Sequence, residues 1–151
     1  MAARKRPTQS SEASVVEAVF GGLGQLAKLV WQTFRGGSQA VDPKAAQTLQ
    51  VGWNQVEQHL TVPATYALAV SEADKLFDLA LKASGIRGQT LGERLKSSER
   101  RFSSDLYNQL WNAHKLRNRL AYEVGVLVTP NEVQVAVRVL QQGINQLGFS
   151  V

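Results

Sequence analysis

Helix-start signals recur along this chain, and each is followed by apolar residues at steps of three and four. Asp42 can cap a helix, and Pro43 suits the first helical position after it. Thr129 is followed three residues later by Glu132, which is the spacing of a capping box. Pro63 ends one periodic stretch and can open the next. These helix-start signals predict a series of helices.

The stripes between these signals predict an all-α fold, an antiparallel bundle of four or five helices over residues 42–151. The run VGVLVT at 124–129 is the one stretch of strand type, and it lies between two well-signalled helices, so we expect a connector there. The expected helices begin near residues 43, 63, 91, 104 and 130 and end near residues 60, 85, 101, 125 and 147.

A separate amphipathic helix is expected before the bundle, over residues 14–35. Glycines inside it cost about 1 kcal/mol each relative to alanine, so it needs a surface to lie on. The bundle, a partner subunit or a bilayer interface could provide that surface. Peripheral membrane contact through Val15–Phe34 is therefore one hypothesis. Residues 1–13 are expected to be a flexible basic arm, and residues 36–41 a linker.

Composition excludes several kinds of site. The chain of 151 residues has no cysteine, which excludes disulfides and thiol-bound metals. The two histidines, His59 and His114, lie on separate segments, so we expect no metal site, and no motif indicates another cofactor. No apolar run is long enough to span a membrane and no signal peptide is evident, so cytoplasm is the default expectation. The net charge of +5 favours anionic partners.

The segment HKLRNRLAYE at 114–123 concentrates the polar groups that could carry chemistry. With about 100° per residue, we expect one side of this helix to carry all the candidates, next to a core-facing stripe. The candidate catalytic residues are His114, Arg117, Asn118 and Tyr122.

Basic residues outnumber acidic ones nine to three between Lys82 and Arg119. If the helix expected at 91–101 packs beside the 104–125 helix, a positive face suited to a phosphate backbone results. A solvated face laced with ion pairs is the alternative. The candidate RNA- or phosphate-binding residues are Lys96, Arg100, Arg101, Lys115, Arg117 and Arg119.

The run LWNAHKLRNRLAYE resembles the signature helix of HEPN domains, a superfamily of helical bundles. Their motif is an arginine, often followed by asparagine, and then a histidine after four to six intervening residues. Arg117 and Asn118 match the first two positions, Glu123 matches an acidic residue sometimes found after the histidine, and Tyr122 stands where the histidine would be. The resemblance covers the last two helices, and the preceding two by length and order.

Many HEPN domains are metal-independent ribonucleases that act as homodimers, in which the arginine holds the scissile phosphate and the histidine handles a proton. A guanidinium suits the first role. A phenol, with a pKa near about 10, cannot act as a general base at neutral pH without a large shift. The resemblance therefore implies a dimeric, catalytically degenerate HEPN-like module that binds RNA or a protein partner through the Arg117–Tyr122 surface.

Three alternatives stay open. The chain could be an active metal-independent ribonuclease, of a toxin or defence kind, in which His114 supplies the imidazole. It could be a membrane-surface helical scaffold held by Val15–Phe34. The segment could also be an ordinary basic amphipathic helix, with Arg117 in a salt bridge, Asn118 bonded to the backbone, Tyr122 packed at the rim and His114 bonded to a neighbour beside the core.

Overall fold

The computed structural model describes residues 41–151, which form one compact unit. The basic arm expected at 1–13, the amphipathic helix at 14–35 and nearly all of the linker at 36–41 lie outside the described residues, as does the membrane contact expected of Val15–Phe34. Those expectations stay predictions.

The described chain is helical, as predicted. No strand occurs between residues 41 and 151, and the VGVLVT run is a connector. The elements in chain order are α2 (Pro43–His59), the short 3₁₀ helix η1 (Pro63–Thr65), α3 (Tyr66–Ala83), α4 (Leu91–Ser97), the 3₁₀ helix η2 (Glu99–Arg101), α5 (Ser104–Tyr122) and α6 (Pro130–Gln146).

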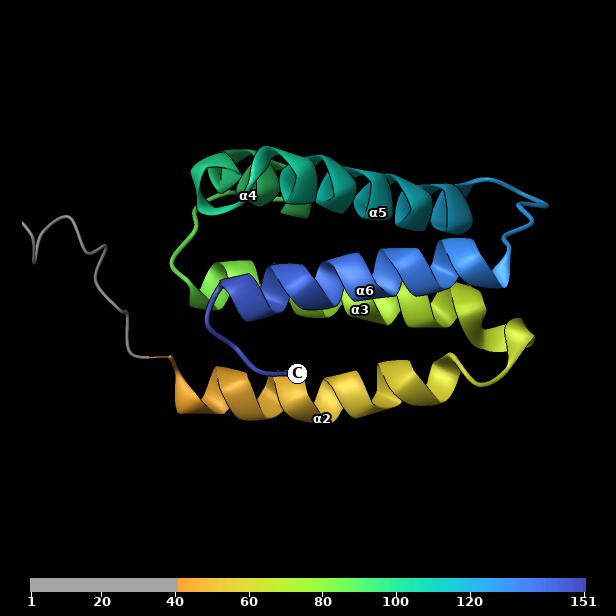
Figure 1. The fold of residues 1–151 in the computed structure, drawn as a ribbon, viewed down its shortest axis with the longest axis horizontal. Coiled ribbons are helices and arrows are strands. Elements are labelled where there is room, and N and C mark those ends of the chain that lie inside the picture. Colours follow the sequence, from red (N-terminus) through yellow and green to blue (C-terminus); the bar gives the residue numbers. More distant parts are fainter. Residues whose placement is uncertain (1–40) are drawn as a thin grey trace, which may run out of the picture. The chain divides into compact units, whose positions relative to one another are not determined.

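The four long helices run alternately up and down (Figure 1). In this view α2 lies along one side, α3 and α6 form the middle, and α5 lies along the other side with α4 next to its first turns. Helix α3 contacts α2, α4, α5 and α6. It is therefore the element against which the rest of the bundle is assembled.

The helix starts that the sequence predicts are confirmed. The carboxylate of Asp42 accepts a hydrogen bond from the backbone N–H of Lys44 at 3.0 Å. Thr129 and Glu132 form the complete capping box, with the Thr129 hydroxyl accepting from the Glu132 N–H at 3.2 Å and the Glu132 carboxylate accepting from the Thr129 N–H at 2.8 Å. The backbone and hydroxyl hydrogen bonds from Thr129 hold the pKa of Glu132 below its ordinary value.

The short helix expected near residues 91–101 differs from the prediction. It breaks at Ser98, whose hydroxyl donates to the carbonyl of Leu95 at 2.8 Å, and the chain continues as η2. The helix is also not polar all round, because it buries Arg94 and Leu95. Local spacing could not show this, since the partner that draws Arg94 inward belongs to α3.

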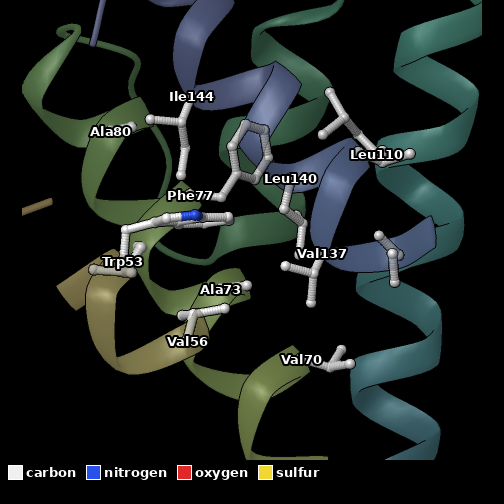
Figure 2. Close-up of a cluster of buried hydrophobic side chains, with 14 of the residues drawn as sticks. Trp53, Val56, Val70, Ala73, Phe77, Ala80, Leu110, Val137, Leu140 and Ile144 are labelled. Carbon is white, nitrogen blue, oxygen red and sulfur yellow. The ribbon is translucent and has the colours of Figure 1, made fainter. Parts of the chain in front are cut away.

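The core is centred on Phe77 of α3, which has no exposed surface (Figure 2). Trp53 and Val56 reach it from α2, and Leu110 reaches it from α5. Most of the stripes predicted from the sequence are buried here. The α6 members of the cluster in Figure 2 are Val137, Leu140 and Ile144.

Gly143 lets α6 approach its neighbours closely. A Cβ built at this position would lie 2.8 Å from a methyl carbon of Leu110 and 2.8 Å from the ring of Phe77. Neither side chain has room to withdraw, since both are fully buried. Gly92 of α4 offers the opposite case, because its added Cβ would meet the Trp111 ring at an ordinary 3.6 Å.

We expect Gly143→Ala to lower the free energy of unfolding by about 1–3 kcal/mol, because the methyl group overpacks the Phe77–Leu110 contact. Urea denaturation followed by far-UV circular dichroism measures this. Gly92→Ala is the matched control and should be neutral or stabilising by up to about 1 kcal/mol, since alanine is the better helix former. Equal behaviour of the two variants would contradict the close approach at Gly143.

Candidate functional site

Two of the four candidate catalytic residues contact one buried carboxylate, and a third contacts both of them. Asp74 projects from α3, and only 5% of its side chain is exposed. From α5, His114 and Arg117 contact Asp74, and Asn118 contacts His114. We call these four residues the Asp74 cluster.

The distances within the Asp74 cluster describe one connected network. His114 Nδ1 lies 3.1 Å from each carboxylate oxygen of Asp74. The amide nitrogen of Asn118 lies 3.3 Å from His114 Nε2. Arg117 donates from a terminal nitrogen to Asn118 Oδ1 at 3.1 Å. The side chains of two helices thus form a single hydrogen-bonded chain.

This arrangement assigns a protonation state to His114. Its Nδ1 faces a carboxylate, which only accepts, so Nδ1 carries the hydrogen. Its Nε2 faces the amide nitrogen of Asn118, which only donates, so Nε2 offers a lone pair. In this arrangement the imidazole of the Asp74 cluster donates from Nδ1 and accepts at Nε2.

Arg117 lies at the border between the buried cluster and the solvent. Its Nε is 3.7 Å from Asp74 Oδ2, and 25% of the side chain is exposed. This Nε is buried and makes no hydrogen bond within the described residues. The salt-bridge alternative thus fits the buried Nε of Arg117, while a quarter of the side chain is exposed to solvent.

Tyr122 is the last residue of α5, and it is 79% exposed. It follows Asn118 by four residues, which turn a helix by about 40° beyond a full rotation, so it lies one turn beyond Asn118 on a similar side of α5. Asn118 bonds side chains of the cluster rather than the backbone.

Trp111 closes one side of the imidazole. Its ring lies edge-on to His114 with the ring centroids 6.2 Å apart, and Tyr107 lies edge-on to Trp111 at 6.3 Å. These three rings follow one edge of α5. They leave His114 only 15% exposed.

The candidate phosphate-binding residues divide into one half-buried arginine and a group of exposed ones. Arg117 belongs to the Asp74 cluster. Arg119 has a distant ion-pair contact with Glu123 at 3.8 Å, both side chains being well exposed. The exposed candidates are Lys96, Arg100, Arg101, Lys115 and Arg119.

Two basic residues of the 82–119 stretch share the single negative charge of Asp78. Arg94 is buried and forms a two-point ion pair with Asp78, with Nε at 2.6 Å and a terminal nitrogen at 3.0 Å; it also donates to the carbonyl of Gly88. Lys82 reaches the same carboxylate at 2.7 Å. Burial alone would raise the pKa of Asp78, but the hydrogen bonds and charges of Arg94 and Lys82 outweigh it and lower that pKa. The positive face is weaker than the sequence count suggests.

Sequence reasoning missed Asp74, on which the cluster is centred. One feature of the sequence could have indicated it. Asp74 is a charged residue that follows Val70 by four positions and adjoins Ala73, so it continues an apolar stripe whose members are buried. Its partner His114 is 40 residues away in the chain, so no local motif could join them.

Within residues 41–151, no three metal-ligating side chains lie together as a group that could hold a metal ion. None of the helices in that range is long and apolar enough to cross a bilayer.

We expect Arg94→Met to lower the free energy of unfolding by about 3 kcal/mol at neutral pH, because it leaves Asp78 with Lys82 alone. Since the folded-state pKa of Asp78 is lowered, its contribution is present above about pH 4 and is lost as the pH falls through the lowered pKa. The difference in the free energy of unfolding between wild type and Arg94→Met should therefore become smaller in acid.

Urea titrations across the pH range measure this difference. Arg87→Met, at an exposed arginine in the same basic stretch, is the matched control and should change stability little. A difference between Arg94→Met and wild type that persists unchanged in strong acid would show that the lost side-chain packing, and not the ion pair, carries the effect.

No family model, no curated protein and no solved structure matches this chain.

Proposed function

We propose that this chain is a HEPN-like helical module, dimeric and catalytically degenerate, that binds RNA through the Arg117–Tyr122 surface of α5. Its support is the composition of that surface, where Lys115, Arg119 and Tyr122 are exposed and Arg117 lies at the border. The partial exposure of the Arg117 side chain is the observation that carries the proposal.

Phosphate is the group that this surface suits. Lys115 and Arg119 are free to turn toward a backbone, and a guanidinium offers a planar fork that matches phosphate oxygens. The exposed phenol of Tyr122 can stack on a base or donate a hydrogen bond. Nothing at Tyr122 replaces the proton transfer of an imidazole, so binding without cleavage is the expected behaviour.

The dimer is supported by apolar surface at one end of the bundle. The three most exposed large apolar side chains of residues 41–151 are Tyr122, Val124 and Leu127, at the end of α5 and in the loop after it. A groove of about 280 Å³ lies between α5 and α6. It is lined by Gln109, Asn112, Ala113, Leu116, Arg119, Glu132, Val135, Ala136 and Val139.

Both charge signs border this groove. Arg119 and Glu132 line it together with the apolar side chains, so a two-fold axis can bring the arginine of one copy to the glutamate of the other. Contact there would cover apolar surface that a monomer leaves in water.

An active ribonuclease is the second candidate, and one observation favours it. A carboxylate that holds the Nδ1 hydrogen of a histidine is the arrangement that orients a general base. In this structure Nε2 already accepts a hydrogen bond from Asn118, so the base would have to lose that contact before it could reach a substrate.

We expect Arg117→Ala to weaken binding of a mixed-sequence RNA oligonucleotide about tenfold at low salt, the loss typical of one charge-assisted contact. Fluorescence anisotropy measures the affinity. Arg138→Ala is the matched control, since Arg138 is an exposed arginine beside α2 on another face. Equal losses from both variants, or no binding at all, would remove RNA from the proposal and favour a protein partner.

The same RNA, incubated in EDTA, separates the two candidates. Wild type should leave it intact, and Tyr122→His, which completes the motif, should gain cleavage. Cleavage by wild type that disappears in His114→Ala would favour the active ribonuclease instead.

We expect Val135→Lys to convert a dimer into a monomer, because it places a charge in the α5–α6 groove. Size-exclusion chromatography with light scattering measures the mass. Val51→Lys, at an exposed valine of α2, should leave the dimer intact. A monomeric wild type at high concentration would contradict the dimer.

A further inference from the structure

We propose that protonation of His114 reverses the hydrogen-bonded chain of the Asp74 cluster and releases Arg117 from Asn118, so that anion binding at Arg117 strengthens as the pH falls. The release follows from the cluster's own geometry. Its consequence for binding rests on the function proposed above.

The chain has one direction in the neutral state. Arg117 donates to Asn118, Asn118 donates to Nε2 of His114, and Nδ1 of His114 donates to Asp74. Every link uses a donor on one side and an acceptor on the other. At its far end the Asp74 carboxylate can only accept.

A proton added to His114 goes to Nε2, the one ring nitrogen with a free lone pair. That nitrogen then becomes a donor and faces the amide nitrogen of Asn118, which is also a donor. The conflict is removed when the Asn118 amide rotates by half a turn and presents its oxygen to Nε2. The amide nitrogen then faces the terminal nitrogen of Arg117, and their hydrogen bond is lost.

The charges favour the same outcome. The groups that face His114 are Asp74 from α3 and, on its own helix, Asn118 and Arg117 beyond it. The other charges near this part of α3 are Asp78, Arg94 and Lys82, which are paired with one another. Asp74 and Arg117 together are neutral while His114 is neutral. Protonation therefore leaves one uncompensated positive charge in the cluster.

Arg117 is the group able to move. Its Nε makes no hydrogen bond within the described residues, and its contact with Asp74 is long at 3.7 Å. Protonated His114 competes for the same carboxylate from 3.1 Å. A quarter of the Arg117 side chain is already exposed, so a short rotation presents the guanidinium to an outside anion.

Asn118 is thus a positioning residue that couples an imidazole to a guanidinium. A direct effect of the His114 charge on a bound anion would not need Asn118. That difference makes the coupling testable.

The test is nitrogen-15 NMR of the full chain from about pH 8 to about pH 5, with the ring nitrogens of His114, the side-chain amide of Asn118 and the Nε of Arg117 followed together. We expect all three to change with one midpoint. Asn118→Leu, with Asn118→Ala as the smaller replacement, should leave His114 titrating while the Arg117 signal no longer follows.

Controls use the two histidines of the chain. His114→Gln should abolish the transition at Arg117, and His59→Gln should leave it intact, since His59 lies at the end of α2. An Arg117 signal that ignores His114 in wild type, or that follows it equally in Asn118→Leu, would overturn the coupling.

Affinity for the mixed-sequence RNA oligonucleotide then tests the consequence. Between about pH 8 and pH 5.5 the gain in wild type should exceed the gain in Asn118→Leu by about fivefold or more. Equal gains would overturn the link to binding. Coupled NMR transitions without RNA binding at any pH would support the release of Arg117 and overturn the proposed function instead.

Discussion

Two carboxylates one turn apart on α3 hold the basic half of the bundle in place. Asp78 receives Arg94 from α4 and Lys82 from its own helix, and Asp74 receives His114 and Arg117 from α5. Both acids lie on the helix that contacts every other long helix. A buried carboxylate without a partner is costly, so these pairings fix which faces of α4 and α5 turn inward.

The apolar core alone would define the bundle less sharply. Stripes of leucine, valine and alanine can slide or rotate at small cost, since cores tolerate many arrangements of similar volume. Charged contacts at fixed spacing permit fewer alternatives. The two-point contact between Arg94 and Asp78 orients α4, although that helix has only seven residues. The ion pairs of Asp74 and Asp78, together with the close approach at Gly143, limit the registers in which the helices can pack.

Much of the fold could be predicted because its determinants are local. The cap at Asp42, the capping box at Thr129 and the stripe of α6 each occupy a few neighbouring positions, and each is found in the structure. The break at Ser98 and the inward turn of Arg94 could not be predicted. They depend on Asp78, which is 16 residues away from Arg94, and sequence spacing does not report such distances.

The candidate site was predictable in part for the same reason. His114, Arg117 and Asn118 share one helix, so helical spacing brings them together correctly. Asp74 comes from another helix, and it changes the chemistry of the others by holding Nδ1 of His114 and by placing a negative charge 3.7 Å from Arg117 Nε. Tyr122 lies one turn beyond Asn118 at the exposed end of the same helix, so its part in the site stays a prediction.

The order of the helices has a consequence for how the bundle opens. Each long helix packs beside a neighbour in the chain, α2 with α3 and α5 with α6, while α3 joins the two hairpins through α5 and α6. Such bundles can open locally along the seam between the two hairpins while the helices of each hairpin stay folded. Asp74 lies on that seam, between α3 and α5, so an opening there would bring water to a carboxylate that the closed bundle keeps nearly dry.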